Sequence, residues 1–162
     1  PTWTDRAEAL KGKIPEERRE WLLRERAIDT RSGLPQGMFS NVPSTAPNPV
    51  WIKANGDVPD DPDIHTQLIT YASDIAFVDN MYRPHRRADS PGVMLASLDH
   101  ALWFHRPARL DDWLLFHQDS PSAYGARGFA RGSIFDRAGV HLASVAQEGV
   151  MRELDPEKSG QG

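Results

Sequence analysis

The sequence predicts an α+β fold in which one central helix packs against an antiparallel sheet. Three observations support this prediction. A helix-forming apolar run spans residues 68–78, a short β run precedes it at residues 50–54, and four runs rich in apolar and aromatic residues follow it at tight spacing. Strands separated by such short turns are antiparallel neighbours. A helix that packs on an antiparallel sheet belongs to the α+β class.

Residues 1–49 are expected to form a helical segment followed by a linker arm. Two short helices are predicted at residues 4–11 and 15–26, and the second has glutamates early and arginines late, as the helix dipole favours. Residues 32–49 contain four prolines and two glycines among small polar residues, which is typical of an extended linker. We therefore predict a domain boundary near residue 49.

The main domain is expected over residues 50–152. After the first strand, Asp61 caps a helix that Pro62 begins. Four antiparallel strands are then predicted at residues 93–106, 112–123, 126–136 and 140–151. A sheet that wraps around a single central helix is the hot-dog fold, which is the arrangement we expect here.

Two segments of the chain are predicted to lie outside the sheet and the central helix. Residues 79–91 contain three arginines and a histidine, and they predict a polar loop that is able to move as a flap. Residues 153–162 predict a flexible tail.

Composition limits the classes of protein that this chain can represent. A length of 162 residues suits one domain, and the absence of cysteine excludes disulfides, thiolate metal clusters and a cysteine nucleophile. The formal charge of −4, with arginines alternating with acids, argues against a nucleic-acid partner. No apolar run of about 18 residues predicts a membrane span. We expect a cytoplasmic protein, and since the chain begins at Pro1 without an initiator methionine, a piece of a longer protein.

Three polar residues are candidates for catalysis. Asp74 interrupts the apolar helical run, and a carboxylate removed from water must be paired, hydrogen-bonded or used in chemistry. Ser97 on the first strand after the helix adds a hydroxyl, and Gln147 on the last strand adds an amide. Together these groups can hold and deprotonate a water for attack on a carbonyl. Each residue also has a structural explanation. Asp74 can accept hydrogen bonds from backbone amides, Ser97 can fill a small site on a strand, and Gln147 can bond a carbonyl at the edge of the sheet.

Other catalytic patterns are not found in the sequence. The six histidines lack the spacing of metal ligands, and neither a serine nucleophile elbow nor a phosphate-binding glycine loop occurs in a suitable context. We therefore expect no metal and no cofactor. Asp99 and His100 are next to Ser97, but adjacent strand residues point to opposite faces, which favours a structural role for this pair.

Five motifs together resemble the carboxyl-terminal half of the acyl-CoA thioesterase II family. They are WIKANG at residues 51–56, YASD at 71–74, SLDHALWFHRP at 97–107, ARGFARG at 126–132 and VAQEGVMR at 145–152. They occur in the family's order and at compatible spacing. In that family one chain holds two hot-dog repeats, and an Asp, a Thr or Ser and a Gln of the second repeat activate a water. By motif, the resemblance assigns these roles to Asp74, Ser97 and Gln147.

The resemblance implies hydrolysis of fatty acyl-CoA to free fatty acid and CoA, without a metal or redox cofactor. Direct attack by Asp74, through an acyl anhydride, stays open as a variant of this mechanism. Arg106, Arg127 and Arg131 are candidates to bind the CoA phosphates through forked hydrogen bonds, although a solvated or ion-paired role is favoured for each one alone.

The family's first repeat has no counterpart in this sequence. The resemblance therefore implies a partner, either a second hot-dog repeat or another copy of the chain in a homo-oligomer. The alternative function is a non-catalytic hot-dog half that binds acyl-CoA or provides dimer contacts and needs the missing repeat for activity.

Overall fold

The computed structural model describes residues 2–34, 42–75, 77–86 and 92–154. Its strands are β1 (Ile28–Ser32), β2 (Asn48–Ala54), β3 (Val93–Ser97), β4 (Ala101–Phe104), β5 (Leu114–Tyr124), β6 (Arg127–Phe135) and β7 (His141–Glu153). They form one seven-stranded sheet in the order β1-β2-β5-β6-β7-β3, and β4 also pairs with β7. All the pairs are antiparallel, as the sequence predicted.

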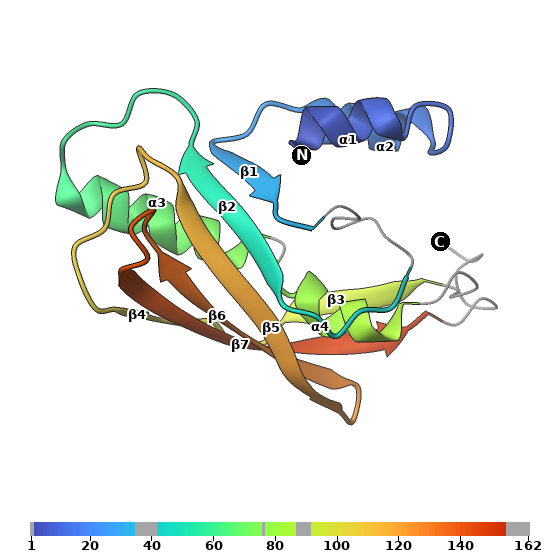
Figure 1. Cartoon of the computed structure of the whole chain (residues 1–162). Coiled ribbons are helices and arrows are strands. Elements are labelled where there is room, and N and C mark those ends of the chain that lie inside the picture. Colours follow the sequence, from blue (N-terminus) through green and yellow to red (C-terminus); the bar gives the residue numbers. More distant parts are fainter. Residues whose placement is uncertain (1, 35–41, 76, 87–91, 155–162) are drawn as a thin grey trace.

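The helices are α1 (Trp3–Ala9), α2 (Glu16–Leu23), α3 (Pro62–Asp74), α4 (Asp79–Tyr82) and the 3-10 helix η1 (Arg83–His85). Figure 1 shows α3 on one side of the curved sheet and α1 and α2 together near β1. The predicted start of α3 is confirmed, because the Asp61 side chain accepts a hydrogen bond from the Asp63 amide at 2.9 Å and Pro62 follows the cap.

The core lies between α3 and the sheet. Ile69 and Ala72 of α3 belong to the same buried cluster as Ile52 of β2, Phe116 of β5 and Ile134 of β6. The buried residues of α3 recur at the spacing of one helix face: His65, Ile69, Ala72 and Ser73. The side of the sheet that faces α3 is therefore the inner face, and the other side is the outer face.

The run at residues 93–106 forms two strands rather than the one that was predicted. The chain bends at Leu98, so that β3 pairs with the carboxyl-terminal part of β7 and β4 with its amino-terminal part. Ser97 lies opposite Gly149, and Ala101 lies opposite Ala146. Residues 98–100 therefore connect two strands along the same partner.

Strand β1 was not predicted. Its first residue, Ile28, is buried opposite Ala54 of β2. Strand β2 begins at Asn48, so that part of the predicted linker belongs to the sheet, and residues 35–41 of that linker lie outside the described residues. The domain boundary near residue 49 and the tail from residue 153 stay predictions, and residues 155–162 also lie outside the described residues.

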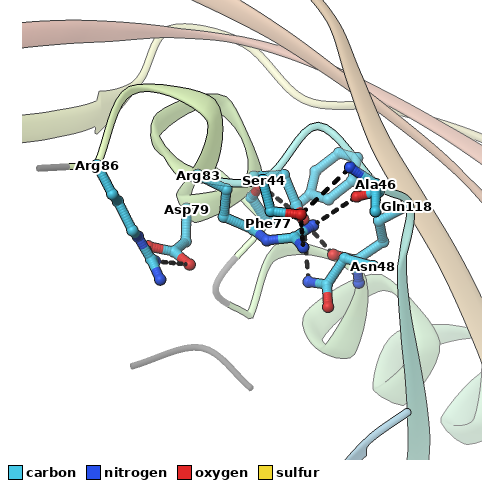
Figure 2. A network of polar contacts seen from close by, with 9 residues as sticks. Ser44, Ala46, Asn48, Phe77, Asp79, Arg83, Arg86 and Gln118 are labelled. Atoms are coloured by element: carbon cyan, nitrogen blue, oxygen red, sulfur yellow. Dashed lines mark hydrogen bonds and ion pairs between the residues drawn. The ribbon is translucent and has the colours of Figure 1, made fainter. Parts of the chain in front are cut away.

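The described part of the predicted polar loop is helical. Residues 79–85 form α4 and η1, while residues 87–91 lie outside the described residues. Figure 2 shows the polar contacts that fix this segment. Asn80 donates to Gln118 at 2.6 Å and to the Phe77 carbonyl at 2.9 Å, and it accepts from Asn48 at 3.0 Å. Buried amides with this many partners hold α4 against β2 and β5, which a polar loop prediction did not anticipate.

Candidate active site

Asp74 is the last residue of α3, and its side chain is 56% exposed. The expectation that this carboxylate is buried was therefore wrong. Its neighbour Ser73 is the buried polar residue of this turn, with no exposed surface. Successive residues on a helix point about 100° apart, so the buried face includes Ser73 and leaves Asp74 at its edge. Asp74 is thus accessible to solvent.

Ser97 and Gln147 are in direct contact. Ser97 ends β3 and lies opposite Gly149, which shares the inner face with Gln147 because strand side chains alternate. The Gln147 side chain is completely buried, and its Nε2 donates a short hydrogen bond to the Ser97 Oγ. The hydroxyl and the amide that were proposed from the sequence are therefore neighbours in the structure.

His100 joins these residues to the end of α3. Its Nδ1 lies 3.0 Å from the Gln147 Oε1 and 3.7 Å from the Asp74 Oδ1, and its Nε2 lies 2.8 Å from the Ser73 Oγ. The ring also packs edge-on against Phe77, with centroids 6.1 Å apart. Asp74 and Gln147 therefore both lie beside the Nδ1 atom of His100.

Sequence reasoning missed this position of His100. The argument from strand alternation assumed one continuous strand through Ser97, but the chain bends at Leu98 and His100 precedes β4. Alternation applies only within a strand, so it gave no information about the direction of the His100 side chain. No pattern in the sequence marks the bend.

The site combines an exposed carboxylate with a hydroxyl and a buried amide. A carboxylate accepts protons, and a hydroxyl and an amide each both donate and accept hydrogen bonds. Such a set can hold a water molecule in one orientation and remove its proton. Among the described residues, no group of three or more histidine, aspartate or glutamate side chains has the geometry to hold a metal ion.

Two of the arginines suggested as phosphate ligands lie on the outer face of the sheet. Ala130 is opposite Gln147 on the inner face, so its neighbours Arg131 and, by alternation, Arg127 point the other way. The Arg131 guanidinium binds the Asp119 carboxylate, with its Nε 2.9 Å from the Oδ1, and this pairing raises the pKa of Arg131. Both arginines therefore lie away from Asp74, Ser97 and Gln147.

Arg127 and Arg106 also have partners outside the candidate site. Arg127 pairs with Glu148 at 3.4 Å, and Arg106 donates to the His141 carbonyl at 2.7 Å. The structure does not bring Arg106, Arg127 or Arg131 into hydrogen-bond contact with the candidate catalytic residues. Their assignment as CoA-phosphate ligands stays a prediction.

None of the helices in the described part of the chain has the length and apolar character needed to cross a membrane.

Comparison with known proteins identifies the family. The family model for acyl-CoA thioesterase matches residues 11–150. Acyl-CoA thioesterase 2 of Haemophilus influenzae is 34% identical over 140 residues, which is 86% of this chain and 49% of the relative. Acyl-coenzyme A thioesterase 8 of Mus musculus is 41% identical over 110 residues, which is 67% of this chain and 34% of the relative.

Solved structures agree with this assignment. The crystal structure of acyl-CoA thioesterase II TesB2 from Mycobacterium marinum superimposes with a TM-score of 0.68 at 37% identity, over 80% of this chain and 50% of that chain. A hot-dog protein from Alicyclobacillus acidocaldarius, at 17% identity and a TM-score of 0.59 over 80% of this chain and 47% of that chain, supports the fold alone. The predicted hot-dog fold is confirmed.

The chain spans about half the length of the first of these curated relatives and about a third of the second. It corresponds to their carboxyl-terminal half, as the motifs predicted. The chain therefore belongs to the acyl-CoA thioesterase II family.

Proposed function

We propose that this chain hydrolyses the thioester bond of fatty acyl-CoA, with Asp74 as general base and Ser97 and Gln147 as the groups that hold the attacking water. The observation that supports this best is that Asp74 and Gln147 both lie beside the His100 Nδ1 at the end of α3, and that Gln147 contacts Ser97. The names of the relatives support the substrate class. The lack of cysteine fits the reducing cytoplasm, where we place this activity.

The proposed reaction needs no group beyond the protein and water. Asp74 takes a proton from the water, whose oxygen bonds to the thioester carbonyl carbon. The resulting tetrahedral intermediate collapses, the carbon–sulfur bond breaks, and CoA leaves as a thiolate that recovers the proton by way of Asp74 or solvent. General base catalysis contributes about 100- to 10,000-fold to the rate of such a step.

The first experiment measures release of free thiol from palmitoyl-CoA by the unaltered chain and by the Asp74→Ala and Asp74→Asn variants. Both variants are expected to lose about 100- to 10,000-fold in kcat. Asp57→Asn is the matched control, because Asp57 is exposed in the turn that follows β2. Thiol release that survives in both Asp74 variants, with circular dichroism showing an intact fold, would rule out Asp74 as the base.

A second candidate function is a binding half that depends on a partner for activity. Strand β3 forms one edge of the sheet, and large apolar side chains are exposed on or near it: Met94, Leu98, Trp103 and Phe104. An apolar edge of this kind favours association. We propose that a second hot-dog repeat or another copy of the chain covers it and that residues 50–152 form the domain that associates. If the unaltered chain releases no thiol until the missing half is added, this second function is the correct one.

A further inference from the structure

One extra residue lies between β3 and β4 where they run along β7. Ser97 pairs with Gly149 at the end of β3, whereas Ala101 pairs with Ala146 at the start of β4. The three residues 98–100 therefore face only two residues of β7. Such an insertion is a β-bulge, which shifts the register by one residue and redirects the side chains that follow it.

The register shift decides which side chains reach the buried Gln147 amide. In an uninterrupted strand, Asp99 would share the inner face with Ser97, and His100 would lie on the outer face. With the extra residue, the Ser97 Oγ accepts from the Gln147 Nε2, and the His100 Nδ1 lies 3.0 Å from the Gln147 Oε1. Both ends of this amide are therefore in contact with residues of the same bend.

The carboxylate of Asp99 takes the place of a backbone acceptor at the bulge. Leu98 donates its amide to the Glu148 carbonyl at 2.9 Å, and in a regular ladder the Glu148 amide would donate back to the Leu98 carbonyl. It donates to the Asp99 Oδ1 instead, at 2.6 Å. Hydrogen bonds to a carboxylate are stronger than those between neutral groups. Asp99 therefore closes the ladder at the point where the extra residue interrupts it.

This bond lies directly beside the candidate catalytic residues in the chain. Glu148 follows Gln147 on β7, so a bond that fixes the Glu148 amide also fixes the backbone that carries the Gln147 side chain. Asp99 precedes His100 and is two residues from Ser97, so the same bond fixes the backbone between them. Asp99 thus acts through its neighbours.

We propose that Asp99 is a positioning residue for thioester hydrolysis: its bond to the Glu148 amide holds the bulge that directs Ser97 and His100 at Gln147. This inference rests on the proposed function and deepens it. Without the bond, the extra residue is free to shift along the edge of β7, and Ser97 and Gln147 no longer hold the attacking water in one place. Misplacement of the water slows the chemical step without weakening the binding of the thioester.

A kinetic experiment on palmitoyl-CoA tests the catalytic part of the proposal. Asp99→Ala removes the acceptor, and we expect kcat to fall about 10- to 100-fold while KM changes little. Asp99→Asn keeps an oxygen that accepts from the Glu148 amide, so it is expected to recover most of that loss. An unchanged kcat in Asp99→Ala, a loss in KM alone, or an Asp99→Asn variant as slow as Asp99→Ala would overturn the proposal.

Asp136→Ala is the matched control, because it removes the same kind of bond in a turn outside the candidate site. The Asp136 Oδ1 accepts from the Ala138 amide at 2.9 Å and from the Val140 amide at 2.8 Å, between β6 and β7. We expect Asp136→Ala to keep its kcat. Equal losses of kcat in the two alanine variants would mean that Asp99 contributes only to general stability, and would contradict the inference.

A spectroscopic experiment tests the position of the bulge without relying on activity. In ¹⁵N-labelled protein, hydrogen exchange of the Glu148 amide is expected to be at least about tenfold faster in Asp99→Ala than in the unaltered chain or in Asp99→Asn. The side-chain NH₂ signals of Gln147 should shift in Asp99→Ala and stay in place in Asp136→Ala. Unchanged exchange at Glu148, or unmoved Gln147 signals, would refute the positioning role. Failure of the proposed function is recognised separately, because the unaltered chain and Asp136→Ala then release no thiol while these signals still report on the bulge.

Discussion

Ser97 lies at the exposed end of β3, where its hydroxyl contacts the buried Gln147 amide. Ser97→Ala removes the hydroxyl that we place on the water, and kcat is expected to fall about 10- to 100-fold. Ser97→Thr keeps the hydroxyl, and the exposed position has room for the extra methyl group, so near-normal turnover is expected. Steady-state hydrolysis of palmitoyl-CoA by both variants checks this. Equal losses in Ala and Thr would show that the hydroxyl is not the important group.

At the scale of single residues, the sequence predicted which side chains lie close together better than it predicted how exposed each one is. Asp74, Ser97 and Gln147 were selected by residue type and motif, and the structure places all three at one end of α3. The burial of Asp74 was predicted wrongly, because an apolar run does not show which residue stands at the edge of a helix face. The position of His100 depends on a bend between two strands that pair with β7, and such a bend follows from tertiary pairing.

At the scale of elements, the glycines of the ARGFARG motif create space for side chains from other elements. A Cβ atom on Gly128 of β6 would lie 2.6 Å from the Met81 Cβ of α4. Gly149 on β7 is opposite Gly128, and a Cβ atom there would lie 2.9 Å from the Met81 Sδ. Gly128→Ala is therefore expected to destabilise the protein by about 1–3 kcal/mol through overpacking. Chemical denaturation measures this change. The double variant Met81→Ala with Gly128→Ala should recover part of the loss, and strict additivity of the two substitutions would contradict the packing argument.

Helix α4 also carries a carboxylate whose ionisation affects stability. Burial raises the pKa of Asp79 above its ordinary value of 3.8, although the Arg86 guanidinium contacts it and opposes the shift. A carboxyl with a higher pKa in the folded state binds more protons when folded, so its contribution to the free energy of unfolding decreases as pH rises through that interval. The unaltered chain is therefore expected to lose stability relative to Asp79→Asn as the pH rises above the ordinary carboxyl pKa of 3.8. Urea denaturation across this range checks the sign, and the opposite slope would mean that the ion pair outweighs burial.

An element could be predicted when the residues that determine it are close together in the sequence. Helix α3 was predicted from its cap and the proline that follows, and β5, β6 and β7 were predicted from turns at short spacing. Strand β1 was missed because residues 29–32 are polar and only pairing with β2 makes them a strand. The short helix α4 was predicted as a loop because the partners of its buried Asn80 amide are on β2 and β5, which are distant in the sequence.

For the whole molecule, the exposed apolar edge at β3 and β4 predicts self-association or binding of a second hot-dog repeat. Light scattering after size exclusion is expected to show a dimer or larger species. Trp103→Glu is expected to weaken association at least about tenfold, because tryptophans at the centre of interfaces carry much of the binding energy. Tyr124→Ser is the control, since Tyr124 is 90% exposed at the end of β5, and β6 and β7 separate β5 from β3 in the sheet. A monomer at every concentration tested, active without a partner, would exclude the prediction.

The central position of β7 has a consequence for synthesis of the protein. This strand pairs with β3, β4 and β6, and it also supplies Gln147. Until the ribosome has made residues 141–153, neither β3 nor β4 has its partner and β6 has an unpaired edge. Folding that depends on such distant pairings is slow, and open strand edges attract other unfinished chains. The nascent chain therefore completes its sheet and gains the Gln147 amide in the same late step, and until then its open strand edges favour aggregation.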